Sequence, residues 1–120
     1  TGSAAFDSQE FLIGAGDTAD LVIFSAPTFD LSDPNVAVYN ENYKTKYGKD
    51  SDGFAANAYD AVMLVVNAVT DCGEINTDCI RDYLYKVKDY AGVGGLTTFD
   101  QNGDVAKPIM LKTVRNGQFV

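Results

Sequence analysis

The sequence predicts an α/β fold with three or four helices and about four short strands, on three observations. The run Leu21–Phe24 is short, apolar and rich in β-branched residues, which is typical of a strand. Three helical patterns follow one another from residue 34 to residue 87. Residues 109–114 then alternate in polarity and precede Asn116-Gly117, a dipeptide that favours a β-hairpin. The helices are therefore expected to be consecutive, with few strands on either side.

The first predicted elements are a short helix and a strand. Asp7 or Ser8 can cap a helix over residues 9–13, because their side-chain oxygens accept the free amides of a first turn. The Leu21–Phe24 run is continuous rather than alternating, which favours a strand buried on both faces. Pro27 ends it, since proline has no amide to donate to a sheet. Such a strand needs neighbours on both sides, and the sequence does not obviously supply them.

The middle of the chain predicts three helices. The first begins at Ser32-Asp33-Pro34, a capping side chain followed by proline, and Gly48 ends it. Its apolar face consists of Val36, Tyr39, Tyr43 and Tyr47. The second runs from Phe54 to Asp71, and its polar positions form only a narrow stripe, so most of its circumference is expected to be buried. The third begins at Asn76 or Thr77 and has one apolar face.

Two segments after the helices contain motifs that resemble ligand sites. The glycines of residues 92–95 could cradle a phosphate, but the dinucleotide fingerprint needs a strand before it, a helix after it and a glycine where Thr97 stands. A flexible connection to an extended segment at residues 96–99 is favoured. Residues 100–104 alternate carboxylate and amide side chains as calcium loops do, but valine and leucine stand where an EF-hand needs glycine and glutamate. A turn is favoured there.

Composition and charge exclude several functions. The chain has 120 residues, a net charge of −8 and no histidine, and residues 1–43 hold seven acidic residues and no basic one. A surface of that sign repels nucleic-acid phosphates and anionic lipids. Without histidine, Ser-His-Asp, Cys-His and histidine-ligated zinc sites cannot be built from this chain alone. No stretch has the pattern of a signal peptide or a membrane span, so a targeting segment would lie outside this sequence.

The two cysteines, Cys72 and Cys79, flank the connection between the second and third helices. A disulfide across this short loop would stabilise the fold by about 2–3 kcal/mol in the chain-entropy model. The alternative is two unrelated buried thiols in a cytosolic protein. The even count favours the disulfide, and with it an oxidising compartment. Zinc is disfavoured because two thiolates without histidine leave a structural site half empty.

The aromatic residues and one acid are the remaining candidates for ligand contact. The tyrosines could form an aromatic ligand box, but on amphipathic helices they are more often core-edge residues whose hydroxyls reach water. They are Tyr39, Tyr43, Tyr47, Tyr59, Tyr83, Tyr85 and Tyr90. Asp60, on an otherwise apolar helix, is a candidate for a perturbed pKa, although a carboxylate there more often caps or pairs with a neighbouring segment.

Four blocks in order carry a resemblance to a known family. They are GAGDTADLV at residues 14–22, FAANAYDAV at residues 54–62, YAGVGGLTTFDQNGD at residues 90–104, and NGQFV at residues 116–120. Together they resemble the C-terminal part of the type I periplasmic binding proteins. Within that group they are most similar to the branched-chain amino-acid receptors of ABC importers. The resemblance covers essentially the whole chain.

The resemblance implies two α/β lobes joined by three crossing segments, with ligand in the cleft between them. Residues 1–27 would hold the end of the second lobe and a crossing strand. Residues 28–95 would be the helical part of the first lobe, and residues 96–120 a further crossing and the terminal hairpin of the second lobe. The chain would then be a C-terminal fragment of a longer exported protein whose precursor has a signal peptide.

The resemblance also suggests two ligand-binding positions and no catalytic residue. Phe54 matches an aromatic position that lines the side-chain pocket of amino-acid receptors. The acidic group that binds the ligand's ammonium falls at, or just before, Thr1. No acid occurs from Thr1 to Phe6, so either that group lies outside this sequence or the ligand is not an amino acid.

The function expected from the resemblance is that of an extracytoplasmic solute-binding protein, in the periplasm or on the cell surface, with a lipid anchor as an option there. It would hand a small molecule, an amino acid of the Leu/Ile/Val type, to ABC permease subunits without catalysis, metal or cofactor. A second interpretation is an extracellular ligand-sensing receptor domain of the same fold. An enzyme built on aspartates is the weakest.

The predicted elements also indicate how a fragment of this kind would behave alone. The apolar helix that begins at Phe54 and the unpaired edges of Leu21–Phe24 would expose surfaces that other chains can cover. Self-association of the fragment is therefore expected.

Overall fold

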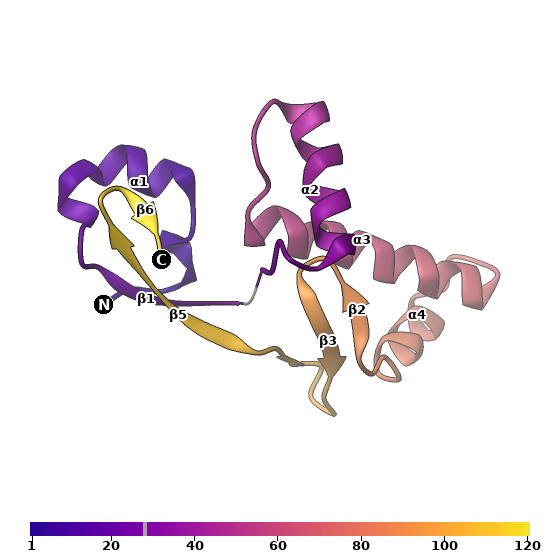
Figure 1. Ribbon diagram of the computed structural model, residues 1–120. Coiled ribbons are helices and arrows are strands. Elements are labelled where there is room, and N and C mark those ends of the chain that lie inside the picture. The colour runs from indigo at the N-terminus through magenta and orange to yellow at the C-terminus, as the bar shows by residue number, and fades with distance from the viewer. Residues whose placement is uncertain (28) are drawn as a thin grey trace. The chain divides into compact units, whose positions relative to one another are not determined.

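A computed structural model describes residues 1–27 and 29–120, and the chain forms two compact units (Figure 1). Unit 1 comprises Thr1–Thr28 and Pro108–Val120, and unit 2 comprises Phe29–Lys107. The chain therefore leaves unit 1 once and returns to it once. The lobe boundaries expected from the resemblance stay predictions.

Unit 1 combines short helices with a three-stranded antiparallel sheet. Its elements are η1 (Ala4–Phe6), α1 (Gln9–Ala15), η2 (Gly16–Ala19), β1 (Ile23–Pro27), β5 (Ile109–Arg115) and β6 (Gln118–Phe119). The strand order is β1-β5-β6, with Ile23 opposite Thr113 and Pro27 opposite Ile109. β5 and β6 form the predicted hairpin, in which Asn116 and Gly117 both have positive φ. This is the conformation that an Asn-Gly turn adopts at little cost.

An aromatic cluster forms the core of unit 1. Phe24 and Val114 are fully buried, and the Phe24 ring lies edge-on to Phe119 with a centroid separation of 5.7 Å. Phe6 stacks on Phe11 at 4.4 Å. A largely buried ion pair lies beside this cluster, because Lys112 Nζ donates to both carboxylate oxygens of Asp7, at 2.8 and 2.9 Å. These contacts connect the N-terminal residues to the returning strand β5.

The first strand differs from its prediction in position and burial. Leu21 has a φ of 63°, two residues after the end of η2, so it cannot continue a strand, and β1 begins at Ile23. Burial alternates along β1, since Phe24 and Ala26 are buried while Ile23 is exposed. The expectation of burial on both faces is therefore wrong. One edge pairs with β5, and within the described residues the other edge carries a single bridge, from Phe24 to Gly2.

Unit 2 contains three consecutive helices and a second three-stranded sheet. Its elements are α2 (Pro34–Tyr47), α3 (Gly53–Cys72), α4 (Thr77–Leu84), β2 (Tyr90–Gly92), β3 (Gly95–Phe99) and β4 (Val105–Ala106). The order β2-β3-β4 is antiparallel throughout. Asp33, Asp52 and Asn76 cap the three helices through their side chains. Gly48 and Gly73 end α2 and α3 in the left-handed conformation.

The structure differs from the sequence prediction at four places in unit 2. The glycine segment at residues 92–95 is not a flexible connection but the tight end of the β2–β3 hairpin, with Gly92 opposite Gly95. α4 ends at Leu84, and β4 is an additional two-residue strand. α3 is buried along one stripe only, while Tyr59, Val62 and Val66 are exposed. Two other helices and three short strands are too few to surround a helix of 20 residues.

The disulfide between Cys72 and Cys79 is present, which confirms the predicted pairing. Its sulfur atoms are 2.02 Å apart and join the last residue of α3 to the first turn of α4. The bond closes the short connection that contains Gly73 and the capping residue Asn76.

Candidate functional site

The two predicted ligand contacts belong to different units. Phe54 lies in the first turn of α3, where the Asp52 carboxylate accepts the Ala55 amide at 2.8 Å, and 54% of Phe54 is exposed. Thr1 is also exposed, and the amide of the following residue, Gly2, donates to Ile23 O in unit 1. An exposed aromatic ring on a capped, regular helix is suited to forming one wall of a ligand site. Both roles stay predictions.

A buried carboxylate lies two turns further along α3. Asp60 is 3% exposed, and its two oxygens accept the backbone amides of Val93 and Gly94 at 2.9 and 2.7 Å. The carboxylate therefore holds the β2–β3 turn against α3. Of the two roles weighed for Asp60, pairing with a neighbouring segment is the one that this geometry fits. Burial raises the pKa of Tyr90, and the nearby Asp60 charge raises it further.

The glycines of the hairpin make this close approach possible. A Cβ atom at Gly92 would overlap the Asp60 carboxylate, and a Cβ at Gly94 would lie 2.7 Å from Asn57 Oδ1. Neither glycine has a positive φ, so the requirement concerns space rather than backbone conformation. The spacing of these glycines predicted a flexible connection, whereas they form a turn packed on Asp60.

Lys107 completes the polar cluster, 50 residues from Asn57 in the chain. Its ammonium donates to Asn57 Oδ1 at 2.5 Å and to Gly94 O at 3.1 Å. Burial lowers the pKa of Lys107, and the nearby Asp60 charge opposes that effect. Sequence reasoning missed Lys107 because no local pattern marks it, whereas Asn57 and Asp60 share a helix face and could have been paired.

Four of the seven tyrosines gather between α2 and α3. Tyr39, Tyr43, Tyr47 and Tyr59 line a cavity of about 640 Å³, together with Lys46 and several small or apolar residues. The rings of Tyr39 and Tyr59 are 5.1 Å apart, and those of Tyr43 and Tyr47 are 4.5 Å apart. Burial raises the pKa of Tyr39, whose hydroxyl accepts a hydrogen bond from Ser51 Oγ. The rings contact one another, as expected of core-edge residues.

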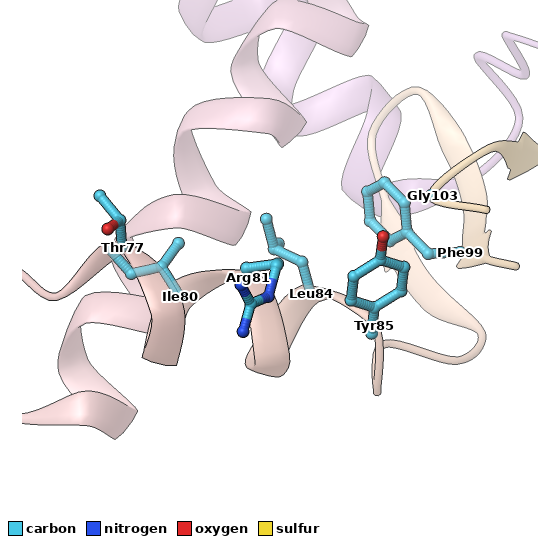
Figure 2. Close-up of a pocket in the computed structure, with 7 residues that line it drawn as sticks. All are labelled: Thr77, Ile80, Arg81, Leu84, Tyr85, Phe99 and Gly103. Atoms are coloured by element: carbon cyan, nitrogen blue, oxygen red, sulfur yellow. The ribbon is translucent and has the colours of Figure 1, made fainter. Parts of the chain in front are cut away.

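A smaller groove of about 300 Å³ lies between α4 and the β3–β4 turn (Figure 2). Ile80, Leu84 and Tyr85 line it from the α4 side, and Phe99 and Gly103 line it from the sheet. Arg81 also lines it, and its guanidinium forms ion pairs with Asp78 and Asp82 at 3.0 and 2.8 Å. The groove is mostly apolar.

The acidic segment at residues 100–104 forms the favoured turn. Asp100 Oδ1 accepts the amides of Asn102 and Asp104 at 2.8 and 2.9 Å, which lowers the pKa of Asp100. Within residues 1–27 and 29–120, no three acidic or cysteine side chains are grouped to hold a metal ion. Every helix in the same ranges is too short or too polar to cross a membrane.

Comparison with known proteins identifies the family. The family model described as periplasmic binding protein matches residues 2–118. The chain belongs to the periplasmic binding protein family. No curated protein sequence matches it significantly.

Solved structures place the chain among the type I periplasmic binding proteins. It is 27% identical to the leucine binding protein LivK of Thermotoga maritima, with a TM-score of 0.87. It is 32% identical, with a TM-score of 0.86, to LivJ of Streptococcus pneumoniae, a branched-chain amino acid transporter substrate binding protein solved in complex with isoleucine. A putative branched-chain amino acid ABC transporter from Rhodospirillum rubrum is 35% identical, with a TM-score of 0.73. The matches cover 98% of this chain but only 34–35% of those proteins. The chain therefore spans about a third of their length, and the predicted fold class is confirmed.

Proposed function

We propose that this periplasmic binding protein chain is part of an extracytoplasmic receptor that delivers an amino acid of the Leu/Ile/Val type to the permease subunits of an ABC importer. The observation that carries the proposal is the match of 98% of the chain to receptors named for leucine and branched-chain amino acids. The disulfide between Cys72 and Cys79 supports a location outside the cytoplasm. The protein would bind and release its solute without making or breaking a covalent bond.

The role proposed for this chain is to supply part of the binding wall. Phe54 offers an exposed ring on a helix that Asp52 caps and Asp60 fastens to the β2–β3 turn. A rigid support is what an apolar ligand contact needs, because ordering a mobile side chain on binding would cost affinity. In the proposed assignment, residues 28–95 belong to the first lobe, and residues 1–27 and 96–120 hold the crossing segments and the terminal part of the second lobe.

The direct test is a thermal unfolding screen of the full-length protein. We expect L-leucine, L-isoleucine or L-valine to raise the Tm, because a ligand at about 100 times its Kd stabilises the native state by about 2.7 kcal/mol. Small organic acids form the second arm of the screen. A shift with those acids alone would overturn the amino-acid assignment. If neither the amino acids nor the organic acids change the Tm, the proposal that the protein is a receptor for them is overturned.

The proposed contact is tested by Phe54→Ala in the full-length protein. Loss of a buried aromatic contact costs about 1–2 kcal/mol or more, so we expect affinity for the bound amino acid to fall about tenfold. Tyr47→Ala is the matched control, because Tyr47 is similarly exposed, at 56%, but lies on α2. Equal affinity of Phe54→Ala and wild type would remove Phe54 from the site.

Delivery to an importer is tested in cells. We expect cells without the protein to take up less of the radiolabelled amino acid that the screen identifies. Unchanged uptake together with loss of a cellular response to that amino acid would favour the sensing receptor instead.

A further inference from the structure

Lys107 is half-buried where its neighbours are exposed. It is the last residue of unit 2, and Pro108 begins the return to unit 1. From Gln101 to Met110, Lys107 is the one residue that is not exposed. The strand before it, β4, has two residues, both exposed. A strand this short holds the departing backbone weakly, so the Lys107 side chain adds an attachment at this point.

Two acceptors far apart in the chain hold the Lys107 ammonium. One is Asn57 Oδ1 on α3, at 2.5 Å, and the other is Gly94 O in the β2–β3 turn, at 3.1 Å. Hydrogen bonds to a charged donor are roughly twice as strong as neutral ones. The side chain therefore ties the end of unit 2 to both the helix and the hairpin.

Each acceptor is itself fixed. Asn57 Nδ2 donates to Gly53 O at 2.7 Å, which turns Asn57 Oδ1 away from that carbonyl and makes it available to Lys107. Gly94 N donates to the buried Asp60 carboxylate at 2.7 Å. Asn57 lies one helical turn after Phe54, so the anchor point and the proposed ligand wall share the first two turns of α3.

The partners of Lys107 indicate positioning rather than charge pairing. Both oxygens of Asp60 are taken by backbone amides, and the ammonium binds two neutral oxygens instead. Neutral acceptors on two separate elements fix the location of the donor, and the Asp60 charge acts on it without a direct hydrogen bond.

We propose that Lys107 is a positioning residue, which fixes the point where the chain leaves unit 2 to the first two turns of α3, beside Phe54. The backbone at Lys107, where the chain leaves unit 2, then keeps a fixed position relative to the turn of α3 that carries Phe54. The expected effect on ligand affinity rests on the proposed function, whereas the anchoring itself does not.

The experiment measures amide hydrogen exchange in the full-length protein and its Lys107→Met variant, which keeps the apolar stem and removes the donors. We expect exchange at Val105, Ala106, Lys107 and Ile109 to rise about tenfold, the change expected from losing hydrogen bonds to a charged group. Amides of α3 should keep their wild-type protection. Lys86→Met, the same change at an exposed lysine of unit 2, should alter neither region.

Two further variants test the proposal independently, in case Lys107→Met does not fold. Asn57→Ala removes one acceptor from the other side and should raise exchange at the same four amides. Lys107→Arg keeps the donors and should return their exchange to within about threefold of wild type. Unchanged exchange in both Lys107→Met and Asn57→Ala would overturn the proposal. An equal rise across α3 would also overturn it, since Lys107 would then act only on the stability of unit 2.

Ligand affinity provides a separate readout, with L-isoleucine as the probe in calorimetry. We expect Lys107→Met to change the Kd for L-isoleucine at least threefold and Lys86→Met to leave it unchanged. If wild-type protein does not bind L-isoleucine while the exchange result holds, the amino-acid assignment fails and the anchoring role of Lys107 stands. If wild type binds and Lys107→Met binds equally well, the link between the anchor and the ligand wall is overturned.

Discussion

Asp60 and the two glycines that face it set the geometry of unit 2 at the residue scale. The carboxylate is buried and accepts two amides from a turn 33 and 34 residues away. A buried carboxylate is tolerated when hydrogen bonds replace its lost hydration. The turn reaches the carboxylate because Gly92 and Gly94 have no side chains to hold it off. The acid and the glycines therefore act as one device.

Replacing Gly92 by alanine tests this device. We expect Gly92→Ala to lower the free energy of unfolding by about 3 kcal/mol, because the new methyl group would displace a buried, hydrogen-bonded carboxylate. Gly14→Ala in α1 is the control: its Cβ would meet nothing within 4 Å, so we expect no loss and a gain of up to about 1 kcal/mol. Urea unfolding measures both. If Gly92→Ala were as stable as the wild type, the turn would not depend on its contact with Asp60.

The lowered pKa of Lys107 predicts a pH dependence of stability. Burial favours the neutral amine in the folded protein, so the unfolded chain binds more protons between the folded pKa and the ordinary value of 10.5. Stability from this group therefore rises with pH across that window. We expect Lys107→Arg, which does not titrate there, to lack this rise when thermal unfolding is followed from pH 8 to pH 10. Parallel curves for the two proteins would contradict the burial effect.

At the scale of elements, the disulfide stabilises the connection between α3 and α4. α4 has only eight residues, which is too short for an independent helix, so its order depends on its neighbours. The bond at Cys72–Cys79 fixes its first turn to the end of α3, while Asn76 caps it by accepting the amides of Asp78 and Cys79. The groove in Figure 2 depends on the same placement of α4.

Removal of the disulfide by mutation tests its contribution to stability. We expect the Cys72→Ser, Cys79→Ser double variant to unfold with about 2–3 kcal/mol less free energy than the oxidised protein, from the loop entropy of a short crosslink. Thiol labelling of the native wild type should require a reductant. Immediate labelling of both cysteines would show that the bond is not formed in solution and would weaken the extracytoplasmic assignment.

At the scale of the whole molecule, the 120-residue chain exposes surfaces of the kind that proteins usually cover. Tyr59, Val62 and Val66 lie exposed on α3, and β1 has one sparsely paired edge among the described residues. Contiguous apolar surface and free strand edges both promote association. The relatives of known structure are about three times as long as this chain, and we propose that the rest of the protein covers these surfaces.

The chain expressed alone should therefore self-associate. We expect sedimentation velocity to show that the 120-residue chain forms oligomers whose fraction grows with concentration. At the same molar concentration, the full-length protein should contain a smaller fraction of oligomers. Replacing Val62 and Val66 by lysine should reduce the association of the 120-residue chain, because charges on this face oppose its burial. A clean monomer at high concentration would contradict the prediction.

Local signals in the sequence were enough for the helices, the caps at Ser8 and Asp33, the disulfide and the Asn116-Gly117 hairpin. Each depends on residues within about one helical turn or one loop, such as Asp33 with Asn35 or Cys72 with Cys79. The resemblance of four ordered blocks extended this to the family. The displacement of β1, the exposed sides of α3 and the anchoring of Lys107 could not be read in this way. The anchoring of Lys107 depends on Asn57, 50 residues away, and the exposure of α3 depends on how few elements pack around it, so both are decided only once the chain is packed. The displacement of β1 follows from the left-handed conformation of Leu21, which no residue type in that run marks.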